Sequence, residues 1–215
     1  MAFRRSAGSV AWEDREDDDE EDCRDGSPSG LSGTEAAGLV SSSTDLAASL
    51  RIVPAAYDDP DSVRFVEAVQ DFYRERYGGA DRTPVDPAEF APPRGLFLLG
   101  SLDGTPRCCG GWRRRTTADI GPEDSTVLRP DDAEVKRMWV DPGHRRHGLA
   151  RRLLGELERT AASAGCRRVV LETGDQQPEA TAFYQRLGYR PMPRFGVYRE
   201  EPGSRCFRRD LVAGA

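Results

Sequence analysis

The sequence predicts a mixed α/β domain, because strand-like and helix-like patterns alternate along its second half. Ala133–Val140 alternates like a strand, and a strong amphipathic helical pattern follows it. Arg168–Glu172 is nearly all apolar, which is typical of a central strand covered on both faces. Pro178–Leu187 then has a helical pattern with proline in its first turn, so residues 133–190 form a strand–helix–strand–helix core.

The segments in front of this core predict further strands and one helix. Leu50–Pro54 is expected to open the domain as a strand, and apolar residues at helical spacing then predict a helix that ends near Tyr77. Leu96–Leu102 and Arg107–Arg115 are two strands joined by Asp103–Gly104, which is a hairpin signal.

The remaining elements follow from glycine positions and apolar spacing. Gly165 is expected to end a helix whose apolar residues share one face, namely Leu149, Ala150, Leu153, Leu157, Ala161 and Ala164. Phe195–Tyr198 and Arg205–Leu211 are predicted to finish the domain as strands.

The first 49 residues are predicted to be a disordered leader, with a folded domain over residues 50–215. Residues 13–25 are mostly acidic, and few branched apolar residues are present to offset the entropy of folding. Residues 1–50 carry a charge of −8 from 12 acids and 4 arginines, which leaves +2 for the rest. The leader is interpreted as a solvating tail, or alternatively as a contact for a basic partner or an internal mimic of a polyanion.

Composition also limits the class of protein. The N-terminal twelve residues lack the long apolar core of a signal peptide, and no stretch approaches the ~18–20 apolar residues that cross a bilayer. We therefore expect a soluble, cytoplasmic protein without membrane contacts. No C-x-x-C spacing is present, so free thiols and no metal site are expected. The five cysteines are Cys23, Cys108, Cys109, Cys166 and Cys206.

An anion-binding cradle is indicated at 141–150, where a strand passes into a strong helix. Backbone N–H groups at a helix N-terminus bind phosphate with the help of the helix dipole. Gly148 has no Cβ, so the backbone there can approach a bound phosphate closely. The arginines of this segment add positive charge around the cradle. A glycine in an ordinary loop with solvated arginines is the structural alternative.

Three segments around this cradle carry a resemblance. Arg145-x-x-Gly148-x-Ala150 resembles the Q/R-x-x-G-x-G/A signature of GNAT acetyltransferases. The segment 177–189 is similar to that family's N-x-x-A-x-x-x-Y-x-x-x-G-F/Y helix, with Gln177 where asparagine is usual. The tail at 195–207 resembles a subgroup of small bacterial GNAT enzymes. The resemblance implies a GNAT fold with a mostly antiparallel sheet of six to seven strands, a splayed parallel pair and about four helices.

The resemblance also implies a co-substrate and the residues that hold it. The donor would be acetyl-CoA, with its pyrophosphate on the cradle amides and its pantetheine paired to the splayed strand like an added strand. The implied coenzyme-binding residues are Met138, Trp139, Val140, Arg145, Arg146, His147, Gly148, Leu149, Ala150, Arg151 and Gln177.

Two residues are expected to carry the chemistry. An amine is mostly protonated at neutral pH and needs a base before it attacks a thioester, while the leaving thiolate benefits from an acid. Glu134 lies at the family position for a glutamate base, and partial burial would raise its pKa toward neutrality. Tyr184 matches the family tyrosine that protonates the thiolate. The structural alternative for Glu134 is an ion pair with a nearby arginine, and the alternative for Tyr184 is a core aromatic residue on an amphipathic helix.

The acceptor is expected to be a primary amine of a small molecule, bound by Lys136, Arg137, Glu172 and Tyr198 and by the loops 78–95 and 116–131. Lys136 and Arg137 could clamp a carboxylate, which would favour an amino-acid-like amine. The alternative function is a non-catalytic acyl-CoA sensor. A nucleic-acid partner is not expected, because the domain charge is only +2. The protein is expected to be a monomer or a homodimer.

Overall fold

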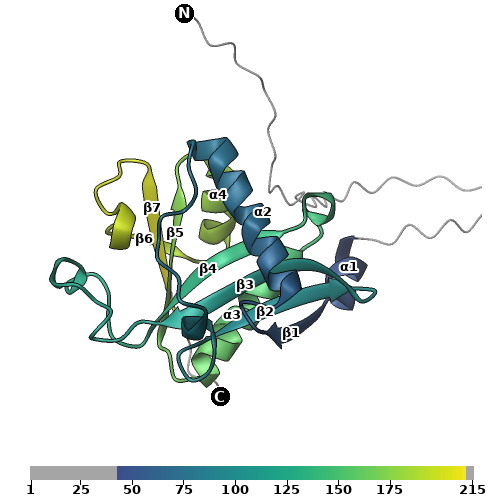
Figure 1. The fold of residues 1–215 in the computed structure, drawn as a ribbon, viewed down its shortest axis with the longest axis horizontal. Helices are drawn as coiled ribbons and strands as arrows, with labels where there is room; N and C mark the ends of the chain where they lie inside the picture. Colours follow the sequence, from purple (N-terminus) through teal and green to yellow (C-terminus); the bar gives the residue numbers. More distant parts are fainter. Residues whose placement is uncertain (1–42, 212–215) are drawn as a thin grey trace, which may run out of the picture.

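The computed structural model describes residues 43–211, which build one seven-stranded sheet in the order β1-β2-β3-β4-β5-β7-β6 (Figure 1). Neighbouring strands are antiparallel except for β4 and β5, which are parallel. The strands are β1 (Arg51–Ala55), β2 (Gly95–Leu102), β3 (Thr105–Arg114), β4 (Asp132–Val140), β5 (Arg168–Gly174), β6 (Arg190–Met192) and β7 (Ser204–Asp210). The mixed α/β prediction is confirmed.

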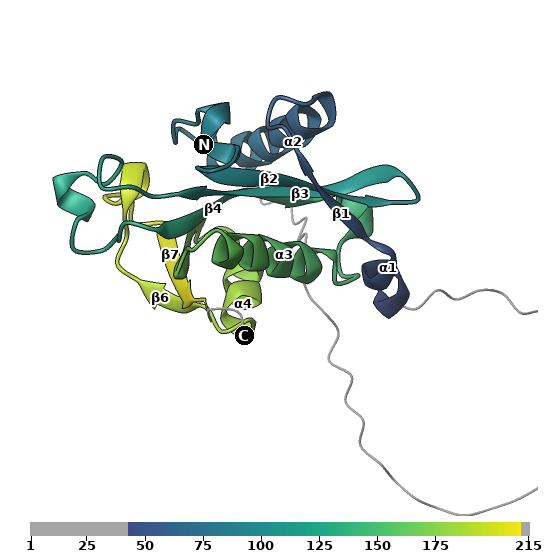
Figure 2. The ribbon, with the colours of Figure 1, turned by 90° about the horizontal axis from the view of Figure 1, so that it is seen from below.

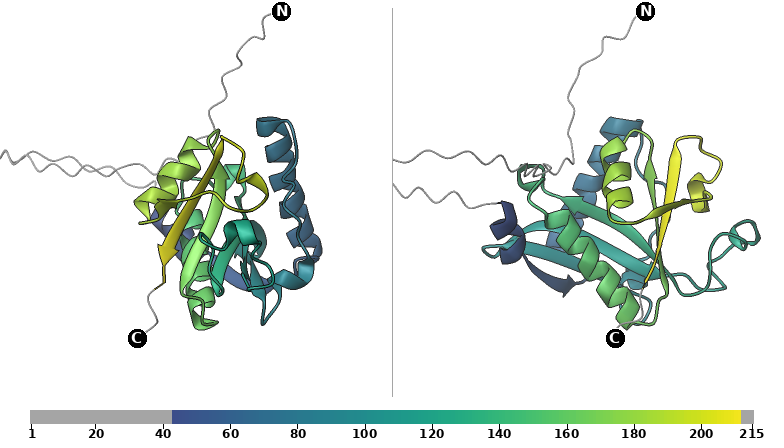
Figure 3. Two further views of the ribbon diagram at one scale, coloured as in Figure 1. Left: turned by 90° about the vertical axis from the view of Figure 1, so that its left-hand side faces the viewer. Right: turned by 180° about the vertical axis from the view of Figure 1, so that it is seen from behind.

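Helices cover both faces of the sheet. Helix α2 lies on one face, and α3 and α4 lie on the other with α1 at the end of α3 (Figures 2 and 3). The α-helices are α1 (Ser43–Ser49), α2 (Pro60–Tyr77), α3 (Leu149–Ser163) and α4 (Pro178–Arg186). Short 3-10 turns are η1 (Pro87–Phe90), η2 (Pro122–Asp124), η3 (Pro142–His144) and η4 (Gly196–Tyr198).

The amphipathic pattern of α3 produces the main core. Its apolar face, which includes Leu153, Leu154 and Leu157, is buried against β2–β5. Val169 and Val170 on β5 are both fully buried but belong to cores on opposite faces of the sheet. The all-apolar stretch of β5 is therefore central, as its sequence predicts.

The parallel pair separates soon after it begins. Strand β4 pairs with β5 only from Asp132 to Glu134, although both strands continue well beyond that point. A register shift between β3 and β4 near Cys109–Gly111 adds a bulge to β4, where Arg137 has a φ of 56°. The divergence opens a space between two central strands, and that space positions the candidate site.

Two differences from the sequence prediction concern the C-terminal part. The expected strand Phe195–Tyr198 is instead a turn of 3-10 helix, because Gly196 has a φ of 70° and donates its amide to Asp124 at 3.1 Å. The edge strand there is β6, which has no apolar alternation and contains Pro191, as edge strands tolerate.

At the N-terminal end, α1 lies within the segment expected to be a leader, so regular structure begins before the expected boundary at residue 50. The prediction for residues 1–42, including Cys23, falls outside the described part of the chain. Over 43–211, no helix is both long and apolar enough to cross a membrane.

Candidate functional site

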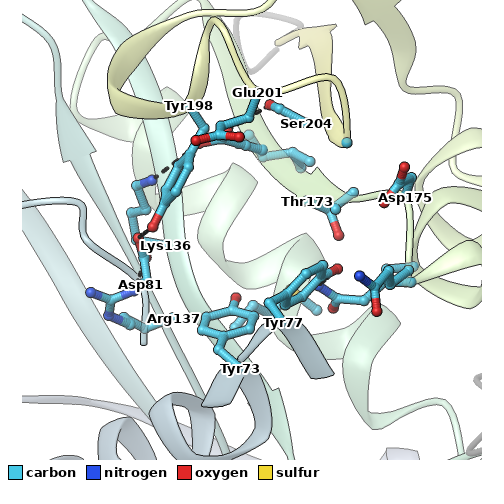
Figure 4. A pocket seen from close by; sticks show the side chains of 18 of the residues that line it. Tyr73, Tyr77, Asp81, Lys136, Arg137, Thr173, Asp175, Tyr198, Glu201 and Ser204 are labelled. Carbon is cyan, nitrogen blue, oxygen red and sulfur yellow. Dashed lines mark hydrogen bonds and ion pairs between the residues drawn. The ribbon is translucent and has the colours of Figure 1, made fainter. Parts of the chain in front are cut away.

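A pocket of about 530 Å³ occupies the space between the separated strands β4 and β5. Its walls come from these strands, from the end of α2 and the loop after it, from α4, and from the segment between η4 and β7 (Figure 4). The pocket therefore collects residues from four separate stretches of the chain, at 73–82, 135–138, 171–184 and 198–204. Both Glu172 and Tyr184 line it.

Tyr184 extends from α4 over the bulge of β4. Its hydroxyl lies 3.9 Å from the Met138 sulfur, and its ring packs against Phe183 and Tyr189. Burial raises the pKa of Tyr184 well above its ordinary value, so the hydroxyl is protonated at neutral pH. The phenol therefore forms part of the pocket wall and carries its proton at neutral pH.

Glu134 does not have the environment expected from the sequence. It is 3% exposed, and its carboxylate contacts Arg113 at 2.9 Å, Arg115 at 3.2 Å and Lys136 at 3.2 Å. Burial alone would raise the pKa of Glu134, but the three cations outweigh it and lower the pKa to about 2. The expected rise toward neutrality is wrong. A carboxylate held this way is a poor proton acceptor at neutral pH.

Glu172, expected only as an acceptor-side residue, has the properties of a base. It projects from β5 into the pocket and accepts a 2.6 Å hydrogen bond from the Ser204 hydroxyl. Burial raises the pKa of Glu172, although Lys136, 4.0 Å away, and Ser204 act in the opposite direction. A buried carboxylate with a raised pKa holds a proton more readily than an exposed one.

Lys136 and Arg137 both line the pocket, but each is already paired with protein carboxylates. Lys136 lies between Glu134 and Glu172, and Arg137 forms a close ion pair with Asp81. Both side chains are nearly buried, with exposed fractions of 9% and 3%. Their charges are thus compensated by the described part of the chain, which removes the reason for expecting a carboxylate clamp.

One end of the pocket is bridged by Tyr198. Its hydroxyl donates to Asp81 at 3.0 Å and accepts the Arg82 amide at 2.5 Å, and the Arg82 side chain reaches Glu201 at 3.0 Å. Figure 4 shows Tyr198 descending from the C-terminal segment toward Asp81. These contacts tie the loop after α2 to the segment after η4 and narrow this end.

The predicted cradle lies where β4 passes through η3 into α3. Gly148 is the N-cap of α3 with a φ of 73°, and it offers no side chain to cap the helix. The first amides of a helix lack partners within the helix, so Leu149, Ala150 and Arg151 present theirs at this mouth. Arg146 and Arg151 are exposed beside them. These groups fit a phosphate-bearing ligand.

The other predicted coenzyme residues occupy three kinds of position. Arg145 holds the cradle segment against the end of β4. Its Nε donates to the Val140 carbonyl at 3.1 Å, and its guanidinium lies 4.5 Å from the Trp139 ring centre. Trp139 and Val140 are buried, while His147 is partly buried in the loop. Gln177 lines the pocket, with its amide donating to the Tyr77 hydroxyl at 2.9 Å.

Comparisons with known proteins agree with the motifs. A family model described as Acetyltransferase (GNAT) family matches residues 63–189, which is more than half of the chain. The chain belongs to the GNAT acetyltransferase family. A curated Azospirillum brasilense protein named IAA acetyltransferase is 30% identical over 149 residues, covering 69% of this chain and 90% of that protein. This GNAT protein is an acyl-CoA-dependent N-acyltransferase.

Solved structures show the same fold. A Klebsiella pneumoniae protein assigned as an acyl-CoA N-acyltransferase is 27% identical with a TM-score of 0.59, covering 76% of this chain and 98% of that one. The PaiA N-acetyltransferase of Thermoplasma acidophilum, solved with coenzyme A, is 13% identical with a TM-score of 0.51, covering 75% and 99%. The GNAT fold binds acyl-CoA, and the family uses acetyl-CoA as co-substrate.

Several residues of this GNAT pocket are not apparent from the sequence. Tyr73 and Tyr77 follow the helical pattern of a core face, yet both line the pocket. Gly174 leaves room for Tyr77, because an added Cβ would overlap the Tyr77 phenol unless that side chain moved. Asp81 lies within the loop 78–95 that is expected from the sequence to bind the acceptor, and Ser204 lies within the tail that carries the family resemblance, but no pattern gives either residue a role of its own. Over residues 43–211, no cluster of metal-ligating side chains is present.

Proposed function

We propose that this GNAT enzyme transfers an acetyl group from acetyl-CoA to a primary amine of a small molecule by direct attack, with Glu172 as general base and Tyr184 as general acid. The observation that supports it is the placement of both residues in one pocket between the separated strands. Glu134, the base expected from the sequence, is assigned a structural role because it is enclosed by Arg113, Arg115 and Lys136.

The proposed reaction moves two protons. The acceptor arrives as an ammonium ion, and Glu172 takes its first proton, directly or through water, and passes it to solvent. The amine nitrogen attacks the thioester carbonyl, a C–N bond forms and the C–S bond breaks. Tyr184 protonates the departing thiolate, and its phenolate recovers a proton from the acetylated nitrogen. The products are the amide, free coenzyme A and one released proton.

The cradle is proposed to hold the pyrophosphate of acetyl-CoA through the amides that begin α3. Replacing Gly148 by alanine should weaken acetyl-CoA binding about tenfold, because a left-handed φ costs an L-residue ~1–2 kcal/mol and relief requires these amides to move. The added Cβ would also lie 3.2 Å from the Ala47 Cβ. Calorimetric titration with acetyl-CoA measures the change.

The control for this change is Gly155→Ala on the same helix, where nothing lies within 4 Å of the added Cβ. It should leave the dissociation constant unchanged and stabilise the helix by ~0.5–1 kcal/mol. Equal acetyl-CoA affinity of Gly148→Ala and the wild type would remove the cradle from the coenzyme site.

A small acceptor is favoured by the closed shape of the pocket end. The contacts of Tyr198 with Asp81 and Arg82, and of Arg82 with Glu201, bridge this end of the pocket and leave less room for a peptide than for a small amine. The Tyr73 and Tyr77 rings form another wall of the pocket. An acceptor would therefore meet tyrosine side chains and charged groups that are already paired with each other.

The acceptor assignment is tested by thiol release from acetyl-CoA. We expect turnover with one class among amino acids, polyamines and aminoglycosides, and none with peptides that offer a free N-terminus or a lysine. Peptide-only turnover would overturn the small-molecule assignment.

A further inference from the structure

A line of buried and partly buried polar side chains crosses strands β3, β4, β5 and β7 and includes Glu172. It begins with Glu89 of η1, which contacts Arg113 of β3 at 2.7 Å. Arg113 contacts Glu134 of β4 at 2.9 Å, and Glu134 contacts Lys136 at 3.2 Å. Lys136 then faces Glu172 of β5 at 4.0 Å, and Ser204 of β7 contacts Glu172 from the far side at 2.6 Å.

Only the last part of this line faces the pocket. Lys136, Glu172 and Ser204 line it, whereas the carboxylate of Glu134 is enclosed by its three cations. Glu134 therefore contacts Lys136 and is separated by it from Glu172. Because it neutralises and orients Lys136, it determines where the Lys136 ammonium sits relative to Glu172.

The two oxygens of Glu172 are held from opposite sides. The Ser204 hydroxyl donates to Oε1, and the Lys136 ammonium lies nearest to Oε2. Ser204 and Lys136 are 7% and 9% exposed, so water competes little for either contact. Contacts of this kind fix the direction of a carboxylate and favour its charged form.

We propose that Ser204 and Lys136 are positioning residues that orient the Glu172 carboxylate toward the acceptor amine, with Glu134 anchoring Lys136. This inference rests on the proposed role of Glu172 as base. The inference gives a function to Glu134 and the three cations around it, which the proposed transfer reaction does not use directly.

The charged and titratable groups that face Glu172 determine the direction of the expected effect. Lys136 and the Ser204 hydroxyl lower the pKa of Glu172 against the rise caused by burial, whereas Asp81 and Glu134 raise it. Cys206 on β7 is also close, and burial together with Glu172 raises the pKa of its thiol to about 11, so it is neutral. Removing Ser204 or Lys136 should thus raise the pKa of Glu172.

The test is the pH profile of kcat at saturating acetyl-CoA and amine for the full chain. In Ser204→Ala, the acid limb should move up by about one pH unit, because a hydrogen bond to a charged group is lost. Lys136→Met should move it in the same direction. Ser204→Thr keeps the hydroxyl and should restore the wild-type limb, while Ser163→Ala, on an exposed serine of α3, should not change it.

The outcomes separate this inference from the proposed base. The positioning role would be overturned, and the base assignment left intact, by an unchanged acid limb in both Ser204→Ala and Lys136→Met together with a Glu172→Gln profile that rises up to the pKa of the amine instead of levelling off where the wild type does. A wild-type limb in Glu172→Gln would instead overturn the base assignment, and the positioning role with it.

Discussion

Glu172→Gln should lower kcat by about 10²–10⁴-fold, which is the usual contribution of a general base. Glutamine keeps the shape of the side chain and can still accept the Ser204 hydrogen bond, so the pocket should stay intact. It cannot take a proton from the acceptor ammonium. Steady-state thiol release at pH 7.5 measures the loss, and calorimetry should give an unchanged acetyl-CoA dissociation constant.

The residual activity of this variant should also change its dependence on pH. Without a base, only the free amine reacts, and its fraction grows about tenfold per pH unit below an amine pKa of ~10. Glu156→Gln, on a carboxylate that pairs with Arg159 on the outer face of α3, is the control and should keep wild-type kinetics. A Glu172→Gln enzyme with a wild-type kcat would contradict the assignment.

Glu134→Gln should destabilise the protein by about 3 kcal/mol at pH 7. The pKa of Glu134 is lowered from an ordinary value of 4.5 to about 2, and that difference converts to this free energy. A lowered pKa in the folded state stabilises the protein above the unfolded-state pKa. The stabilisation is lost as the pH falls from about 4.5 to about 2, so the difference between variant and wild type should shrink over that range.

Urea unfolding at pH 7 and pH 3 measures these free energies of unfolding. The matched control is Glu123→Gln, whose partner is Arg199 and whose side chain is 54% exposed. Exposed ion pairs contribute little, so this change should cost under about 1 kcal/mol at either pH. If Glu134→Gln and Glu123→Gln cost the same at pH 7, the buried cluster does not stabilise the fold as the geometry indicates.

The elements that follow from local patterns could be predicted from the sequence. The apolar run at 168–172 predicts the central strand because burial on both faces removes any need for alternation. The Asp103–Gly104 turn has positive φ at both residues, which is the conformation that this residue pair favours. Strand β6 could not be predicted, because its three residues are too few to show the alternation of a strand. Its conformation depends on pairing with β7.

The choice between the two glutamates could not be made from sequence. Glu134 and Glu172 lie on adjacent parallel strands, and each has an apolar residue beside it in the sequence. What separates them is the register of β3 against β4, which places Arg113 opposite Glu134. The bulge in β4 and the divergence from β5 then leave Glu172 facing the pocket. Such pairings between distant segments are tertiary information, whereas the proposed cradle lies within the single segment 141–150.

The most direct measurement is product analysis of the wild-type protein mixed with acetyl-CoA and a set of small amines. Mass spectrometry should detect one amine class carrying an added acetyl group, in amounts equal to the free thiol released. Glu172→Gln should bind acetyl-CoA with wild-type affinity and form little product. Tight acetyl-CoA binding by the wild type without any acetylated amine, or equal product from Glu172→Gln, would contradict the account.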